Sequence, residues 1–326
     1  MSEVNRQGLD QVYSCEKSGR SDGPIANIVF VHGLRGHPRR TWEYTDPTGN
    51  HPSTNGPSLH EETSPSEKRS WIRRLKPSSR PKQANDANSP SHDTAAGKLG
   101  CEATFWPADE LPKTVPQADI FTYGYNADVI EGIFQQNNKN SIFQHGNDLM
   151  VRLERSIGND LPIIFVAHSL GGIVVKTPRY KSLLSRVRAV VFCGTPHRGA
   201  DAAAWGRLAA NIVTMALQSS NHRLLTDLQT DSQILDLIQE DFLRILHVGN
   251  INVHSFQESR GLSGIKGFDG KVVDDFSSKL GYSLETTETI DANHMEMVRR
   301  PGCRIISAVI KDYVTDVEKE VEQPSA

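Results

Sequence analysis

The chain has 326 residues, of which 37% are hydrophobic and 23% charged, and its formal net charge is −3. This composition is typical of a soluble globular protein with enough apolar residues for one sizeable core. The slight negative charge gives no general attraction to nucleic acid. No run of about 18 consecutive apolar residues occurs, so the sequence predicts no transmembrane helix.

The first residues, 1–23, are polar and carry charges of both signs without an apolar centre. They predict a flexible N-terminus and no secretory signal. Four cysteines, Cys15, Cys101, Cys193 and Cys303, are scattered without CxxC spacing. This pattern indicates reduced thiols in an intracellular, cytoplasmic protein.

Short apolar runs rich in β-branched residues predict buried strands along the chain. In chain order they occupy 26–31, 119–123, 161–166, 187–193, 251–256 and 286–290. Helical patterns lie between them at 142–157 and 234–246. Continuous apolar strands that alternate with helices predict a mostly parallel sheet with helices on both faces. The predicted fold class is therefore α/β.

The periodic pattern disappears between residues 46 and 100, where Ser, Pro, Asn, Thr and His are frequent. We predict a disordered insertion that interrupts an α/β domain spanning 24–312. Within it, residues 68–82 carry seven Lys or Arg, no acid, and Trp71. Such a run could make peripheral contact with anionic lipid or bind nucleic acid, although the net charge of the chain disfavours nucleic acid. It is also typical of a solvated basic segment. The last residues, 313–326, predict a polar tail.

Ser169 lies in the sequence Ala167-His-Ser-Leu-Gly-Gly172, directly after the strand predicted at 161–166. A serine exposed at a sharp strand-to-helix turn needs small residues two positions before and two after it, because the backbones approach closely. Ala167 and Gly171 meet that need. We predict Ser169 as a nucleophile, against the alternative of a serine with only a structural role in the turn.

A serine nucleophile requires a general base, because its hydroxyl is protonated at neutral pH. In the α/β-hydrolase fold the chain order is serine, acid, histidine. His294 follows the last predicted strand at 286–290, where a loop returns over the edge of the sheet. We predict His294 as the base, and only local structural roles for His32, His168 and His197.

The triad acid is expected just past the strand at 251–256, where Glu258 is the first candidate. Asp269, Asp274 and Asp275 are rivals, because the following loop could bring one of them to the same place. The acid fixes the imidazole tautomer and stabilises the imidazolium. Any of these carboxylates could do so if it is held within reach.

The developing oxyanion needs two backbone N–H donors. One comes from the residue after the nucleophile, Leu170, and the other from the loop after an early strand, where Leu34 is the best candidate. The twelve histidines show neither HExxH nor paired-cysteine spacing, so we expect neither a metal nor a cofactor.

Six motifs occur together in a fixed order. They are Val31-His-Gly-Leu-Arg-Gly36, Phe105-Trp-Pro, Phe121-Thr-Tyr-Gly-Tyr125, Ala167-His-Ser-Leu-Gly-Gly172, Gly194-Thr-Pro-His-Arg-Gly199 and Asn293-His294. The set resembles the lipase-like serine esterase domain of the serine-active-site-containing protein family. That domain also stands at the N-terminus of many fungal NACHT, ankyrin and tetratricopeptide proteins.

The resemblance implies an α/β-hydrolase fold with Ser169, an acid near Glu258, and His294. It also implies lipid metabolism, peripheral to mitochondrial or endoplasmic reticulum membranes. One departure is Pro178, only nine residues after Ser169. Proline should end the helix behind the serine by about Lys176, which is earlier than is usual for this fold.

Two functions fit these patterns. The first is hydrolysis or transfer of an acyl group from a small-molecule or lipid ester, through an acyl-Ser169 intermediate. The second is a catalytically impaired interaction or signalling module on the same scaffold, which the shortened helix favours.

Overall fold

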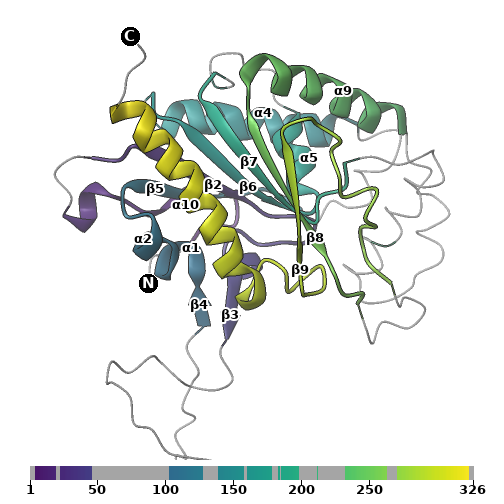
Figure 1. The fold of residues 1–326 in the computed structure, drawn as a ribbon, viewed down its shortest axis with the longest axis horizontal. Helices are drawn as coiled ribbons and strands as arrows, with labels where there is room; N and C mark the ends of the chain where they lie inside the picture. Colours follow the sequence, from purple (N-terminus) through teal and green to yellow (C-terminus); the bar gives the residue numbers. More distant parts are fainter. Residues whose placement is uncertain are drawn as a thin grey trace, which may run out of the picture. The chain divides into compact units, whose positions relative to one another are not determined.

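The computed structural model describes residues 4–19, 23–45, 103–127, 139–157, 160–177, 183, 185–197, 211, 232–262 and 270–322. Its central feature is a seven-stranded sheet, shown in Figure 1. In spatial order the strands are β1 (Gly8–Tyr13), β5 (Ala118–Gly124), β2 (Ala26–Val31), β6 (Ile163–His168), β7 (Val187–Cys193), β8 (Asn252–Glu258) and β9 (Glu285–Ile290). β1 pairs antiparallel with β5, and the other neighbours pair parallel. The predicted α/β class is confirmed.

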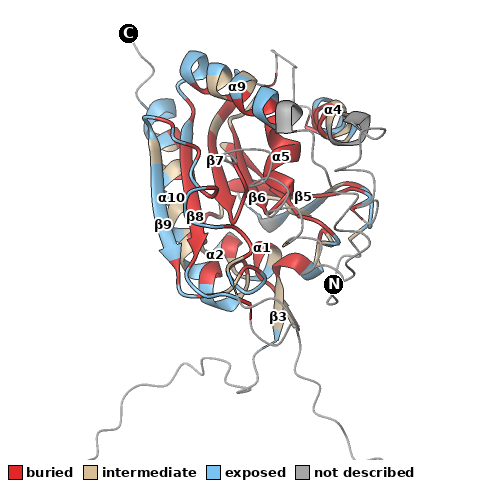
Figure 2. Ribbon diagram, turned by 90° about the vertical axis from the view of Figure 1, so that its right-hand side faces the viewer, coloured by how far each residue is buried: buried red, intermediate tan, exposed pale blue. Residues whose placement is uncertain are grey.

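Helices cover both faces of this sheet (Figure 1). One apolar cluster joins the sheet to α4 (Lys139–Ser156), α5 (Gly171–Lys176) and α9 (Ser232–Gly249). A second joins the opposite face to α1 (Trp106–Asp109), α2 (Leu111–Thr114) and α10 (Arg300–Glu322). Val29 and Val31 of β2 belong to the first cluster, whereas Ile28 and Phe30 belong to the second. Burial on both sides, visible in Figure 2, explains why the central strands are continuous apolar runs.

The predicted flexible N-terminus is wrong for residues 8–13, which form β1 at the edge of the sheet. Their ladder to β5 pairs Leu9 with Tyr123 and Gln11 with Phe121. Five of the six positions of this edge strand stay partly or fully exposed. Polar residues such as Asp10 and Gln11 are therefore tolerated, and the segment lacks the apolar signal of a central strand. A 3₁₀ turn, η1 (Glu16–Ser18), follows.

The predicted polar tail, 313–326, is also wrong as far as Glu322, where α10 ends. This helix buries one stripe of side chains at intervals of three and four residues: Cys303, Ile306, Ile310, Val314 and Val317. Half of its other positions are charged, so the average composition hides an amphipathic helix.

The insertion predicted at 46–100 lies outside the described residues. Its flanks form a separate two-stranded sheet of β3 (Glu43–Thr45) and β4 (Ala103–Phe105), preceded by η2 (Arg40–Trp42). Thr45 and Ala103 are opposite each other in this antiparallel pair. The described chain therefore stops and resumes at neighbouring positions.

Two other properties bear on the predictions. None of the described helices is long and apolar enough to cross a membrane. Cys15, Cys193 and Cys303 are buried and form no disulfide among the described residues, whereas Cys101 lies outside them.

Candidate active site

The turn around Ser169 begins where β6 ends at His168. Ser169 has a φ of 54°, in the left-handed region that side chains with a Cβ rarely adopt. Its N–H donates to Cys193 O at 2.9 Å, and the Thr195 hydroxyl donates to Ser169 O at 3.1 Å. Neighbouring β7 and its following loop thus hold the strained residue in place.

Close backbone contact explains the small residues of this turn. A Cβ on Gly33 would lie 2.6 Å from the Cβ of Ser169, and a Cβ on Gly171 would collide with the backbone oxygens of Val31 and His32. The loop after β2 therefore packs directly against the serine turn, as the spacing of small residues predicts.

His294 stands in a turn just after β9, which ends at Ile290. The Asn293 side chain shapes this turn, because its Oδ1 accepts the N–H groups of Met295 and Glu296 at 3.0 Å each. The His294 side chain is fully buried. Its ring centroid lies 4.9 Å from that of His168.

Glu258 is the last residue of β8 and is buried. Its Oε1 accepts the Val273 N–H at 2.7 Å and lies 3.5 Å from His294 Nδ1. That second contact is longer than an ordinary hydrogen bond and lacks hydrogen-bond geometry. Catalytic hydrogen bonds are often this long before substrate binds.

The rival carboxylates have other partners. Asp274 accepts the N–H groups of Phe276 and Ser277 and the Ser277 hydroxyl, which is a local turn. Asp275 Oδ1 accepts from Lys271 Nζ at 2.7 Å. Asp269 lies outside the described residues. The loop that contains Asp274 and Asp275 thus contributes a backbone N–H, from Val273, rather than one of these two carboxylates.

Several buried polar atoms of this group have no hydrogen-bond partner among the described residues: Ser169 Oγ, Glu258 Oε2, and both ring nitrogens of His294. Buried polar groups are nearly always satisfied, and an unsatisfied cluster calls for a functional explanation. Ser169, His294 and Glu258 follow or end three different strands. His294 and Glu258 lie 3.5 Å apart, and Ser169 directly follows His168, whose ring packs against that of His294.

Two backbone donors of this region are also free. Within the described stretches, no group accepts a hydrogen bond from the N–H of Leu34 or of Leu170. Both residues are buried. They flank the Gly33–Ser169 contact, where an oxyanion hole is expected in this fold.

His32 holds the Leu34 loop in place. Its Nε2 accepts the Tyr125 N–H at 3.4 Å, so Nδ1 carries the ring proton and donates to Gly33 O at 2.9 Å. The Tyr125 hydroxyl donates to His32 O at 2.8 Å, and the two rings stack with centroids 4.5 Å apart. The predicted local role of His32 is confirmed.

The predicted local role of His168 is wrong, because its partner is 126 residues away in the sequence. Its Nε2 is 2.9 Å from the carbonyl oxygen of His294. Burial, and then the nearby His294, lower the pKa of His168 well below the usual value. His197 is likewise buried, with its ring edge-on to Phe192 and its N–H bonded to Ser277 O at 2.7 Å.

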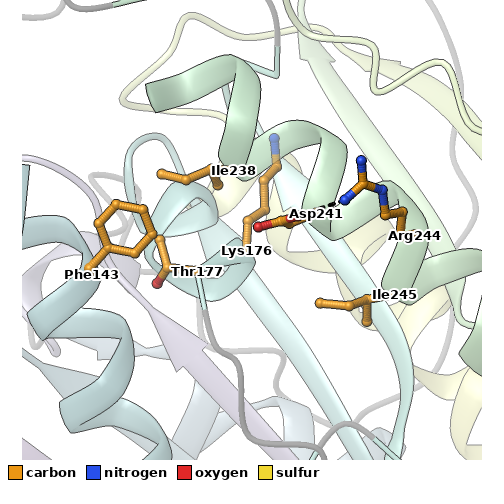
Figure 3. A pocket seen from close by; sticks show the side chains of 7 residues that line it. All are labelled: Phe143, Lys176, Thr177, Ile238, Asp241, Arg244 and Ile245. Atoms are coloured by element: carbon orange, nitrogen blue, oxygen red, sulfur yellow. Dashed lines mark hydrogen bonds and ion pairs between the residues drawn. The ribbon is translucent and has the colours of Figure 1, made fainter. Parts of the chain in front are cut away.

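A cavity of about 270 Å³ lies at the Lys176 end of α5, and Ser169, Glu258 and His294 are not among the residues that line it (Figure 3). Its walls are Phe143, Lys176, Thr177, Ile238, Asp241, Arg244 and Ile245. The helix does end at Lys176, as predicted from Pro178, which itself lies outside the described residues. The Lys176 amine donates a hydrogen bond to Oε1 of Gln239, a residue of α9, at 2.9 Å.

In the described part of the chain, no group of three or more His, Cys, Asp or Glu side chains has an arrangement that could hold a metal ion.

No family model matches the chain. Among curated proteins it is similar to protein SERAC1 of Bos taurus, with 25% identity over 260 residues, which make up 77% of this chain and 33% of that protein. SERAC1 of Mus musculus is 24% identical over 79% of this chain and 34% of its own length. SERAC1 of Homo sapiens is 24% identical over 78% of this chain and 34% of its own length. The chain thus spans about a third of the length of these relatives.

Two solved structures are also similar over most of the chain. A lipase-esterase related protein from Clostridium acetobutylicum is 11% identical, with a TM-score of 0.44 over 95% of this chain and all of that one. A type II thioesterase of the yersiniabactin pathway is 11% identical, with a TM-score of 0.45 over 95% of this chain and 98% of that one. The sheet order, the serine turn after β6 and the histidine turn after β9 are those of the α/β-hydrolase fold, and this chain has that fold.

Proposed function

We propose that this chain is a serine hydrolase that acts on carboxylic esters through an acyl-Ser169 intermediate. One observation carries the proposal: a strained, buried serine follows a strand whose last residue packs against His294, and His294 faces the buried Glu258. Ser169 Oγ, Glu258 Oε2 and both His294 ring nitrogens have no hydrogen-bond partner among the described residues. Strain and unsatisfied groups of this kind cluster at active sites.

The proposed roles follow from the donors and acceptors. The Glu258 carboxylate only accepts, so the His294 tautomer that it favours carries its proton on Nδ1 and leaves Nε2 free as the base. Ser169 Oγ attacks the ester carbonyl while its proton passes to Nε2. The leaving alcohol then takes that proton, and the acyl group stays on Oγ.

In the second half of the reaction a water molecule gives a proton to His294 Nε2 and attacks the acyl carbon. The carboxylic acid leaves, and Oγ regains the proton. With an alcohol in place of water the same steps transfer the acyl group. The N–H groups of Leu34 and Leu170 stabilise the oxyanion in each tetrahedral intermediate.

The substrate class is part of the proposal. The site motifs shared with lipase-like serine esterases support small-molecule or lipid esters, and a lipid substrate would bring the protein into peripheral contact with a membrane. We infer this membrane contact from the shared motifs alone.

Labelling with a fluorophosphonate probe tests the proposal, since only an activated serine reacts. Wild-type protein should be labelled, and Ser169→Ala should not be labelled. The esterase turnover of Ser169→Ala should also fall by a factor of roughly 10³ or more. Ser255→Ala is the matched control, because Ser255 on β8 is also buried and its hydroxyl also has no hydrogen-bond partner in the described part of the chain. Labelling that survives in Ser169→Ala would refute the assignment of the nucleophile.

The second candidate function is a non-catalytic interaction module. The six-residue length of α5 and the missing hydrogen bond between Ser169 Oγ and His294 favour it. A folded wild-type protein that the probe does not label would support this module over the enzyme.

A further inference from the structure

His168 stands between the two residues whose relative position decides proton transfer. It is the last residue of β6 and directly precedes Ser169. Its Nε2 lies 2.9 Å from His294 O. Because a carbonyl oxygen only accepts, Nε2 carries a proton and donates it in this bond. One side chain therefore links the serine turn to the backbone of the histidine turn, 126 residues away in sequence.

The His168 ring is enclosed. It is buried, and it packs against the His294 ring at 4.9 Å and edge-on to Trp42 at 6.3 Å between centroids. Burial and the neighbouring His294 keep the pKa of His168 well below the ordinary histidine value, so the ring stays neutral at neutral pH. Its single N–H is then committed to His294 O.

We propose that His168 is a positioning residue, which holds the His294 backbone at a fixed distance from Ser169 so that the imidazole can take the serine proton. The inference rests on the proposed function. The neutral state also suits the reaction, because a second positive charge beside the imidazolium would oppose the proton transfer.

The position of the imidazole is otherwise weakly restrained. Among the described residues its ring nitrogens have no hydrogen bond, and the Glu258 contact is long at 3.5 Å. The bond from His168 is therefore a principal polar restraint on His294 from the serine side. A displacement of about 1 Å in such a site lowers rates by roughly 10²-fold.

Two variants separate the hydrogen bond from the packing of the ring. His168→Phe keeps a ring against Trp42 but has no donor. His168→Gln places an amide donor near the position of Nε2. We expect His168→Phe to lower kcat and the rate of fluorophosphonate labelling by roughly 10²-fold, with KM within about threefold of wild type. His168→Gln should stay within about tenfold of wild type.

Tyr282→Phe is the matched control. It removes another buried hydrogen bond from a side chain to a backbone oxygen, from Tyr282 to Leu246 O at 3.1 Å, away from the site. It should lower the melting temperature comparably while kcat stays unchanged. A purely structural role for His168 would instead give Phe and Gln variants whose activities follow their melting temperatures.

Each outcome decides the question. Wild-type rates in His168→Phe, or equal losses in the Phe and Gln variants, would overturn the positioning role. If His168→Phe does not fold, His168→Asn replaces it, since its amide is one bond shorter and should not reach; equal activity of the Asn and Gln variants then overturns the role. An unlabelled but folded wild-type protein overturns the proposed function itself, and the positioning role with it.

Discussion

Glu258 is held by its surroundings in a way that a triad acid requires. The Val273 N–H fixes one carboxylate oxygen, and the same oxygen faces His294 Nδ1. We predict that Glu258→Gln lowers kcat by roughly 10²–10⁴-fold, because the amide no longer selects the productive tautomer. Steady-state kinetics on a short acyl ester measures this change.

The rival carboxylates supply the controls. Asp274→Asn should stay within about tenfold of wild type, since Asp274 caps a local turn. Asp269→Asn is expected to behave in the same way. A large loss of kcat in Asp269→Asn together with an active Glu258→Gln would identify Asp269 as the acid.

Lys176 gives a prediction about stability and pH. Burial lowers the pKa of this lysine well below its usual 10.5 in the folded state. Between the folded and unfolded pKa values the unfolded chain binds more protons, so the free energy of unfolding rises with pH. We expect the melting temperature of wild type to rise relative to that of Lys176→Met between pH 7 and pH 10.

Lys311→Met, which replaces an exposed lysine of α10, should follow the wild-type pH curve. Parallel curves for wild type and Lys176→Met would mean that Lys176 keeps its proton in the folded protein. Differential scanning calorimetry across the pH series shows whether the curves of wild type and Lys176→Met diverge or run parallel.

Single residues differ in how much the sequence reveals of them. Ser169 could be predicted because the turn demands small neighbours at fixed spacing. The Val273 N–H that holds Glu258 could not, because every residue except proline has such a donor and only the fold selects one. The bond from His168 to His294 joins two turns distant in sequence, so no local pattern records it.

At the level of elements, we predict from the β3–β4 pair that the insertion can be removed. Thr45 and Ala103 are opposite each other, so a two-residue Asn-Gly turn could replace residues 46–102. We expect the melting temperature to stay the same or to rise by several degrees, because each halving of a loop removes about 0.6 kcal/mol of closure entropy. A fall of about 10 °C, measured by circular dichroism, would indicate lost packing.

Central strands and edge elements show why prediction succeeded for some elements only. β2 and β7 were predicted to the residue, since both are buried on two faces. β6 begins two residues later than predicted and runs on through His168. β1 and α10 were missed because each keeps a polar outer side, and only its contacts with the sheet or core determine its structure.

For the whole molecule, the alternation of strands and helices was enough to predict the α/β class. The order of strands was not predictable in the same way, because it depends on which strands pair across long connections. The placement of β1 beside β5 is such a case. The site depends on this order, since β6, β8 and β9 bring their ends together only after the sheet has formed.

The left-handed backbone of Ser169 also has an evolutionary consequence. A residue with a Cβ in this conformation costs about 1–2 kcal/mol, a noticeable fraction of the roughly 5–15 kcal/mol that stabilises a typical domain. Glycine would relieve that cost, so selection for stability alone favours losing the serine. A scaffold that no longer catalysed anything would drift toward glycine at this position. This expectation separates the proposed hydrolase, which needs the serine hydroxyl, from a binding module, which does not.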